Sequence, residues 1–296
     1  MNLINKNILV SIGLPIYNSN KNLLNKVIKS LVNQTYKNIE LIISDNNSEE
    51  SLFSIINKYK KDDKRIFYYK QKKNIGGEKN RLFVLKKAKG KYFLYSADDD
   101  IISYNFVEKN LLFLERNPNY VGSISPARFH NYKFKLQTMG DQSLEDDYPL
   151  CRAIKSINSL HANARYRSLF IKEALMKCFQ IYKVEFLWND YFLIFKLLFI
   201  GKLKRINQGY MIMGKKGSSS SLKNIMNINQ MNYFSIFFAF NKIYKNILFF
   251  LKKKKIEFNY YTKLYIFLIL FKINIKYVYV NLFKVNFYNS INKLLK

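Results

Sequence analysis

Short apolar runs alternate with segments of helical periodicity along the first hundred residues, and this alternation restricts the fold more than any other feature of the chain. The apolar runs are typical of β-strands and occupy residues 8–12, 39–44, 66–69 and 92–95. Apolar side chains recur at helical spacing at residues 21–34, 52–59 and 78–88. Strands joined by short loops and crossover helices form a mostly parallel sheet with helices on its faces. The predicted fold class is therefore α/β.

The alternation weakens after residue 101. We expect a helix at 101–116, a strand at 121–125, a mobile loop in the acidic stretch 141–149 and an apolar helix at 183–200. A stretch rich in Gly, Lys and Ser at 214–221 predicts a domain boundary. The expected organisation is an α/β domain of residues 1–215, followed by a basic, aromatic and helical region of residues 216–296.

Polar side chains follow three of the predicted strands, and the most acidic of these loops comes after the fourth. In an open α/β sheet, ligands bind outside the carboxyl ends of the strands. Adjacent carboxylates repel one another, and a divalent cation such as Mg²⁺ or Mn²⁺ relieves that repulsion. The alternatives are a solvated acidic turn that caps the next helix and, after the second strand, an Asx-type turn. The residues concerned are Pro15, Tyr17 and Asn18, then Asp45, then Asp98, Asp99 and Asp100.

The charge of the chain restricts its partners. Fifty Lys and Arg against 20 Asp and Glu give a net charge of +30, which attracts nucleic acid, anionic lipid or phosphate-bearing substrates. Part of this charge reflects a general bias of the chain towards Lys and Asn. The apolar content of 49% excludes a disordered protein.

The two cysteines, Cys151 and Cys178, form no CxxC motif, and with two His in the chain they exclude a Cys/His zinc site. We predict two buried, reduced thiols. Apolar stretches such as residues 264–271 fall short of the roughly 20 residues that span a bilayer. The N-terminus lacks the features of a signal peptide, so we expect a cytoplasmic location.

Three stretches of the chain carry a family resemblance. Residues 10–48, from VSIGLPIYNSN to IISDNNS, resemble the opening of family 2 glycosyltransferases. Residues 74–102 resemble the next block of that family, in which an Asn-x-Gly loop and a helix lead to the strand with the metal motif SADDD. Residues 188–207, which begin WNDYFLIF, resemble a later block that contains the catalytic carboxylate. The resemblance implies the GT-A fold and an inverting enzyme that uses a nucleotide sugar.

The same resemblance assigns roles at the donor site. It implies that Asp45 accepts hydrogen bonds from a pyrimidine base, and that a divalent cation and the ribose are held by Asp98 and Asp99, with Asp100 as the alternative metal ligand. Arg81 is implied to contact phosphate, or it lies on a solvated helix face. Ser96 departs from the family, since many members have Asp there. The remaining implied nucleotide-binding residues are Pro15, Tyr17, Asn18, Asn74, Gly76 and Asn80.

Asp190 matches the family's catalytic base, which takes the proton from the acceptor hydroxyl as that oxygen attacks the anomeric carbon. Asn189 stands where the family has Glu, and Glu185 is a second candidate. The alternative is an ordinary Asp on a helix surface. The segment after Tyr210 lacks the His that many members carry, so Lys215 or Lys216 is a candidate for phosphate contact, or part of a flexible basic linker. His161 is expected to be structural.

The C-terminal region differs in composition from the rest. Residues 215–296 contain fifteen Lys, no Arg and one acidic residue, Glu257, which gives +14. Lys interleaved with aromatic and aliphatic residues is typical of helices that lie in a bilayer interface and bind anionic headgroups. The alternative is helices that pack on the α/β domain. Binding of nucleic acid is less favoured because the region lacks Arg and is strongly apolar.

The predicted function is metal-dependent, inverting transfer of a sugar from a nucleotide-sugar donor to a hydroxyl of a saccharide or lipid-linked saccharide. The expected setting is synthesis of bacterial capsule, O-antigen or lipooligosaccharide, with the enzyme peripheral on the cytoplasmic face of the inner membrane and no nucleic-acid partner. One alternative is a basic α/β protein that binds nucleic acid without catalysis. Another is an inactive transferase that acts as a partner subunit.

Overall fold

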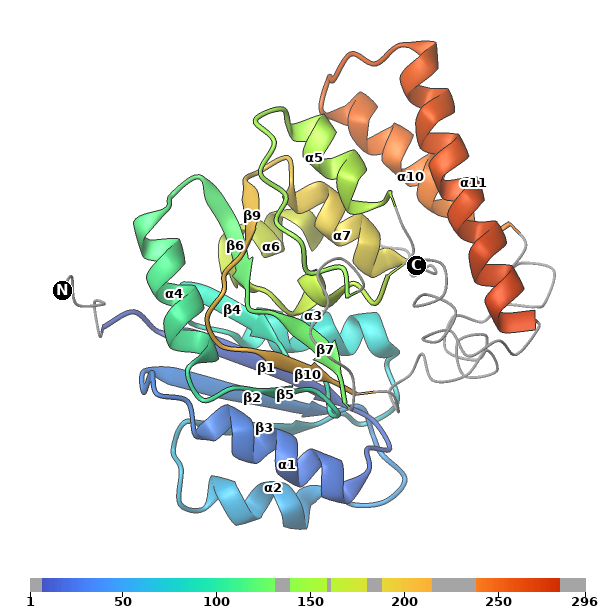
Figure 1. The fold of residues 1–296 in the computed structure, drawn as a ribbon. Helices are drawn as coiled ribbons and strands as arrows, with labels where there is room; N and C mark the ends of the chain where they lie inside the picture. The colour runs from blue at the N-terminus through green and yellow to red at the C-terminus, as the bar shows by residue number, and fades with distance from the viewer. Residues whose placement is uncertain (1–6, 131–138, 159–160, 180–187, 215–237, 283–296) are drawn as a thin grey trace.

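A seven-stranded sheet forms the centre of the molecule (Figure 1). The computed structural model describes residues 7–130, 139–158, 161–179, 188–214 and 238–282. The strand order is β3-β2-β1-β4-β8-β6-β9, and every neighbouring pair is parallel except those made by β8. This arrangement confirms the predicted α/β class with a mostly parallel sheet. The strands are β1 (Val10–Ile16), β2 (Ile39–Asp45), β3 (Ile66–Lys70), β4 (Tyr92–Tyr95), β6 (Tyr120–Ile124), β8 (Leu169–Ile171) and β9 (Lys202–Arg205).

Helices cover both faces of this sheet and give two apolar cores. One face packs against α1 (Lys21–Val32), α2 (Phe53–Lys60) and α4 (Phe106–Arg116). The other face packs against α3 (Gly77–Lys87), α6 (Lys172–Phe179) and α7 (Asn189–Leu197), with α5 (Pro149–Ser156) beside them. A small second sheet of β5 (Ile101–Ile102), β10 (Met211–Met213) and β7 (Ala127–Phe129) lies beside the main one.

The contrast between α1 and α3 shows how local sequence positions the helices. The apolar side chains of α1 recur every three or four residues and all become buried, and the side chain of Asn20 caps the helix by accepting from Leu23 N at 3.1 Å. Helix α3 sits close to the sheet because Gly13 of β1 faces it. A Cβ at Gly13 would lie 2.4 Å from the ring of Phe93, so only Gly fits this position.

Two predictions for the middle of the chain are wrong. Residues 101–116 are not one helix, because Ile101 and Ile102 pair with β10 and the helix begins only at Phe106. The acidic stretch 141–149 is not a mobile loop, since its carboxylates bind cations of β9. The buried Asp141 accepts from Arg205 Nε at 3.0 Å and from Ala127 N at 2.9 Å.

The cysteine prediction is half right. Cys178 is buried as a free thiol on α6, whereas Cys151 lies exposed on α5. The sequence analysis also did not anticipate α5, α6 or the short strands β8 and β10. Of the helix predicted at 183–200, residues 183–187 lie outside the described residues, and α7 begins at Asn189.

Two C-terminal helices extend the core on the α7 side. Helix α10 (Ala239–Lys253) packs on α7 through Phe250, whose ring centroid lies 5.2–6.3 Å from those of Phe192, Phe195 and Phe199. Helix α11 (Tyr260–Leu282) packs on α10 and lies at the outer edge of the molecule (Figure 1). The described part of residues 216–296 therefore shares one core with the α/β domain. The boundary predicted at 215 falls outside the described residues, and within those residues no helix is suited to cross a bilayer.

A buried lysine in this core has a measurable cost. The Nζ of Lys196 donates to Cys178 O at 2.7 Å and lies 4.7 Å from the centroid of the Phe192 ring. Burial lowers the pKa of Lys196 to about 8, below its ordinary value of 10.5. Between these two pH values the unfolded chain binds more protons than the folded one. Stability therefore rises with pH across that window.

We expect Lys196→Met to raise the free energy of unfolding at pH 7 by about 1–2 kcal/mol, because it removes a desolvated cation from an apolar core. It should also flatten the rise in stability between pH 8 and 10. Urea unfolding at pH 7, 8.5 and 10 tests both effects, with the exposed Lys177→Met as control. A variant that is less stable than the parent at pH 7 would contradict the prediction.

Candidate functional site

The loops that leave β1 and β4 meet where the direction of strand order reverses. From β1 the chain moves to β2 on one side of the sheet, and β4 lies on the other side. Such a switch point is where open α/β sheets bind ligands. Here the hydroxyl of Ser19 donates to Asp98 Oδ2, which ties the two loops together. The structure thus brings together the polar loop after the first strand and the aspartates after the fourth.

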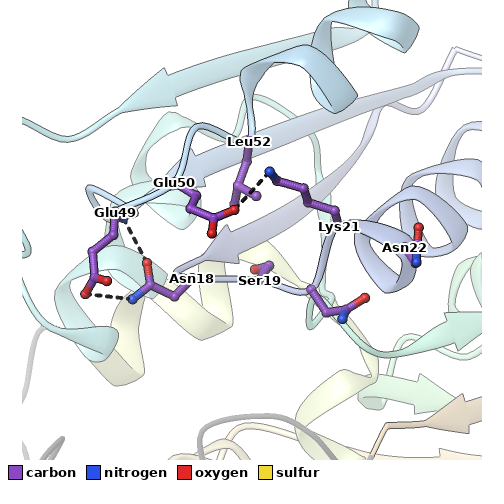
Figure 2. Close-up of a pocket in the computed structure, with 8 residues that line it drawn as sticks. Asn18, Ser19, Lys21, Asn22, Glu49, Glu50 and Leu52 are labelled. Carbon is purple, nitrogen blue, oxygen red and sulfur yellow. Dashed lines mark hydrogen bonds and ion pairs between the residues drawn. The ribbon is translucent and has the colours of Figure 1, made fainter.

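The loop after β1 is fixed to the loop after β2. Asn18 has a left-handed backbone conformation (φ 48°), and its side-chain amide accepts from Glu49 N at 2.9 Å. Its own backbone N donates to Ser48 Oγ at 2.9 Å. Pro15 lies near the end of β1, and the ring of Tyr17 is exposed. A cavity of about 390 Å³ lies beside this loop, lined by residues 18–22 together with Glu49, Glu50 and Leu52 (Figure 2).

Asp45 is fully buried at the end of β2 and already accepts three hydrogen bonds. Its Oδ1 accepts from Ser48 N at 2.8 Å and from Ser48 Oγ at 2.7 Å, and its Oδ2 accepts from Tyr68 OH at 3.2 Å. Burial and the neighbouring carboxylate raise the pKa of Tyr68 to about 12, so this phenol stays a donor. The Asx-type turn is therefore present, and recognition of a base by Asp45 stays a prediction.

The segment 74–80 is held against the end of β2 by amide side chains. Asn74 Oδ1 accepts from Asn46 Nδ2 at 2.8 Å, and Gly76 opens α3 with φ 87°, a conformation that favours Gly. Asn80 is buried and bonds to Ser44, donating from Nδ2 to the backbone O at 2.9 Å. Asn80 thus anchors α3 to the sheet.

The three aspartates after β4 have different surroundings. Asp100 is buried, and its Oδ2 accepts from Arg167 Nε at 2.9 Å while its Oδ1 accepts from Gly214 N at 3.0 Å. Asp98 and Asp99 are half-buried. Burial, with a smaller contribution from the charge of Asp100, raises the pKa of Asp98. Gly214 lies against Asp99, because a Cβ there would be 2.1 Å from the carboxyl carbon.

These contacts restrict the way in which a cation is held. Among the described residues, no three His, Cys, Asp or Glu side chains are grouped as a metal site. Asp100 pairs with Arg167 and accepts from Gly214 N, and the half-buried Asp98 and Asp99 are the carboxylates of this loop that would hold a metal. Mg²⁺ typically binds one or two carboxylates and completes its shell with water and substrate phosphates. The donor set fits a cation of that kind and not an all-protein cage.

Asp190 lies at the beginning of α7. Its Oδ2 accepts from Asn163 Nδ2 at 2.8 Å. Burial raises the pKa of Asp190, and this effect is opposed by the Asn163 hydrogen bond and by the positive charges of Arg81 and Arg167. Trp188, with φ 71°, forms the sharp turn into the helix, and Asn189 Nδ2 donates to Glu78 Oε2 at 3.0 Å. The neighbouring Asn189 thus holds α7 to α3.

Two arginines lie near Asp190, and one of them, Arg167, also reaches the aspartate loop. The guanidinium carbons of Arg81 and Arg167 lie 5.8 and 5.7 Å from the centroid of the Tyr166 ring. Arg81 pairs with Glu78, and Arg167 pairs with Asp100. Guanidinium groups suit a diphosphate because they donate several hydrogen bonds from a planar fork. Contact of Arg81 with phosphate stays a prediction. Arg167 is a second candidate for the same contact.

Sequence reasoning missed Arg167, Asn163 and Glu78. One pattern would have found the arginine, since the chain has 42 Lys and only eight Arg. Where Lys is so strongly preferred, an Arg marks a position that needs the planar group. Carboxylates pair with Arg65, Arg81, Arg167 and Arg205. Backbone carbonyls accept hydrogen bonds from Arg152 and Arg165.

The side chain of His161 holds the backbone of Asn163 in place. Its ring is buried and stacks on Tyr191 at 4.8 Å, and its Nδ1 accepts from Asn163 N at 2.9 Å. Burial and the nearby Arg165 hold the pKa of His161 well below its usual value, so the ring is neutral. This placement agrees with the structural role expected for His161. The other candidates, Glu185, Lys215 and Lys216, lie outside the described residues.

A doubly wound sheet with polar side chains at its switch point places the chain among the ligand-binding α/β folds. The solved structure of S. aureus TarS 1-349 matches 94% of this chain and 75% of its own, with a TM-score of 0.61 and 17% identity. TarS 1-349 in complex with UDP-GlcNAc matches 80% of this chain and 66% of its own, with a TM-score of 0.56 and 20% identity. These likenesses confirm the GT-A fold that the sequence resemblance implies.

Residues 11–179 match the family model described as Glycosyl transferase family 2, and the chain belongs to that family. A glycosyltransferase of Rickettsia bellii is 39% identical over 114 residues, which are 38% of this chain and 16% of that protein. A glycosyltransferase of Haemophilus influenzae is 38% identical over 109 residues, which are 37% of this chain and 43% of that protein. The matched region thus spans less than half the length of these curated relatives.

The contact between Asn163 and Asp190 gives a test of the site's electrostatics. We expect Asn163→Gly to raise the pKa of Asp190, because it removes a hydrogen bond that stabilises the charged form. Gly suits the left-handed backbone of Asn163 (φ 49°). A ¹³C NMR titration of the carboxyl carbon, assigned with Asp190→Asn, measures the change. The exposed Asn47→Gly, also at positive φ (66°), is the control. An unchanged titration in Asn163→Gly would show that the hydrogen bond does not act on the carboxylate.

Proposed function

We propose that this protein transfers a sugar from a nucleotide-sugar donor to a hydroxyl of a saccharide or lipid-linked saccharide, with inversion at the anomeric carbon. The observation that supports this most directly is the placement of Asp190 near Arg81 and Arg167, of which Arg167 also pairs with Asp100 in the aspartate loop. One edge of the sheet then offers a base, cations for a diphosphate and two carboxylates for a metal. TarS structures with UDP and UDP-GlcNAc support a donor of this class.

In the proposed reaction the acceptor oxygen attacks the anomeric carbon while the bond from that carbon to the diphosphate oxygen breaks. Asp190 takes the acceptor's proton, and a single displacement of this kind inverts the configuration. Asp190 must be ionised to act as a base, and Asn163, Arg81 and Arg167 favour that state against burial. The two arginines offset charge on the departing nucleoside diphosphate. When bound by Asp98 and Asp99, Mg²⁺ or Mn²⁺ would neutralise further charge on that leaving group.

The biological role that we propose is synthesis of a bacterial surface polysaccharide, such as capsule, O-antigen or lipooligosaccharide, at the cytoplasmic face of the inner membrane. Support comes from family membership, from bacterial relatives such as those of Rickettsia bellii and Haemophilus influenzae, and from a charge of +30 that suits an anionic surface. A nucleic-acid-binding role would account for the charge, but it gives no reason for the arrangement of Asp190, Asn163 and Arg81.

We expect Asp190→Asn to lose sugar transfer, with kcat reduced by about 10²–10⁴, and to keep its affinity for the nucleotide, because a base touches the acceptor and not the donor. Acceptor turnover and calorimetric titration with nucleoside diphosphate separate the two effects. The exposed Asp147→Asn serves as the control and should change neither. Loss of nucleotide affinity along with turnover would make Asp190 a structural residue.

Activity should also require a divalent cation. Asp99→Asn should abolish turnover, whereas Asp100→Asn should act more mildly on turnover and lower the melting temperature, because Arg167 loses its buried partner. A donor-hydrolysis panel across nucleotide sugars, with Mg²⁺, Mn²⁺ or excess EDTA, measures the requirement. Full turnover in EDTA would exclude a metal from the reaction.

A further inference from the structure

Helix α11 exposes a continuous apolar surface. Its residues are apolar around most of the circumference, and one side packs into the core through Ile266, Leu270, Ile273 and Tyr277. The opposite side has seven large residues, each 39–76% exposed. Six of them follow one another at intervals of three or four, and Tyr265 lies next to Leu264 and three residues before Leu268, so that all seven share one face of the helix. We call this line the α11 stripe. It consists of Tyr261, Leu264, Tyr265, Leu268, Phe271, Ile275 and Tyr279.

Positive charge surrounds the α11 stripe. Lys252, Lys253, Lys254 and Lys255 are all exposed at the turn between α10 and α11. Two further lysines, at positions 272 and 276, lie along the flank of the stripe by helical spacing. Between residues 239 and 282 the sequence has a single acidic residue, Glu257. The complement of this surface is therefore apolar in its centre and anionic around it.

We infer that the α11 stripe docks on an anionic membrane surface, with α11 lying in the plane of the interface. A large exposed apolar line with a charged border marks an interaction site, and Tyr is typical of the boundary between headgroups and acyl chains. Lysines around the apolar line match anionic headgroups. In a dimer built on the stripe, the lysines of two copies would face one another without acidic partners. The helix lies along the bilayer, as no described helix is suited to cross one.

Docking would also set the position of the candidate base relative to the bilayer. This part of the inference deepens the proposed function and rests on it. The ring of Tyr277, on the buried side of α11, meets the ring of Trp188 edge-on at 5.6 Å. Trp188 forms the turn into α7, two residues before Asp190. A bilayer against the α11 stripe would then lie about one helix diameter from Trp188. The acceptor class that this geometry favours is a saccharide carried on a membrane lipid.

The chain provides its own probe, because Trp188 is its only tryptophan. Energy transfer from Trp188 to a dansyl-labelled lipid in vesicles reports both docking and the approach of the site to the bilayer. We expect transfer with phosphatidylglycerol/phosphatidylcholine vesicles, weaker transfer at high salt, and little with phosphatidylcholine alone. Co-sedimentation with the same vesicles gives the partition coefficient. The full chain is used, since α10 and α11 share the core of the α/β domain.

Matched variants separate the stripe from general surface effects. Leu264→Ser with Leu268→Ser should lower the partition coefficient about tenfold or more, since both apolar side chains would enter the interface. The control removes two equally exposed apolar side chains elsewhere, Phe53→Ser with Ile200→Ser, and should bind like the parent. Donor hydrolysis and the melting temperature of both double variants should stay at the parent values.

Charge is tested in the same way. Replacing Lys252, Lys253 and Lys254 by Gln should reduce the preference for anionic vesicles. Replacing three exposed lysines beside α2 by Gln should not: Lys58, Lys60 and Lys61.

Three results would overturn the inference. The first is parent-like binding by Leu264→Ser/Leu268→Ser, and the second is a protein that stays in the supernatant with both kinds of vesicle. The third is a dimer, seen by analytical ultracentrifugation, that the stripe variant converts to monomer while vesicle binding is unchanged. The proposed function fails separately: a chain that docks but consumes no nucleotide sugar would refute sugar transfer and leave the membrane surface intact. Asp190→Asn should dock like the parent.

Discussion

The ion pair between Arg167 and Asp100 holds the candidate site together. Its partners come from the η1 turn (Ala164–Arg167) and from the loop after β4, and Gly214 at the end of β10 completes the carboxylate's hydrogen bonds. Asp100 is only 2% exposed, so loss of either partner would leave a buried charge without compensation. The pair thus fixes three distant segments around one point. It also occupies Asp100, and Asp98 and Asp99 are the carboxylates that we propose as metal ligands.

Through Arg167, the same pair also affects Asp190, the candidate base. The guanidinium groups of Arg167 and Arg81 both lie near the ring of Tyr166. Their positive charges favour the ionised form of Asp190, while Glu78 opposes them. A bound diphosphate would compensate part of the arginine charge. In the proposed reaction, binding of the donor would therefore be coupled to the protonation of Asp190, because both would depend on the same two guanidinium groups.

The first hundred residues could be predicted from sequence because their order is local. In β1 and β2 nearly every side chain is buried, and α1 repeats its apolar residues with the period of a helix. The later strands are set by distant partners. Ile101 and Ile102 become a strand only because β10 pairs with them, and Asp141 is held by Arg205, 64 residues further along the chain. Single-sequence patterns do not contain such pairings.

The residues of the candidate site also divide into those with a sequence motif and those without one. Asp45, Asp98, Asp99 and Asp190 could be proposed from sequence because each belongs to a recognisable motif, and the carboxylate of Asp45 is engaged by Ser48 and Tyr68. Asn163 was missed because its role depends on a left-handed backbone position and on support from His161, neither of which has a pattern in the sequence. Arg167 had a pattern in the scarcity of Arg, which is informative only in a chain so rich in Lys.

That richness in Lys leaves two accounts of the basic C-terminal region, general bias of the composition or selection for an anionic partner. Exposed lysines alone do not separate them, since Lys58, Lys60 and Lys61 beside α2 are equally exposed. The apolar residues do separate them. Helix α2 buries Ile56 and exposes one large apolar side chain, Phe53, whereas α11 exposes an unbroken line of seven. A bias towards Lys and Asn does not place Leu, Phe and Tyr on the solvent side of a helix, and keeping them there has a cost unless a partner covers them. The exposed apolar line, more than the charge, therefore supports the proposal that this face docks on a bilayer.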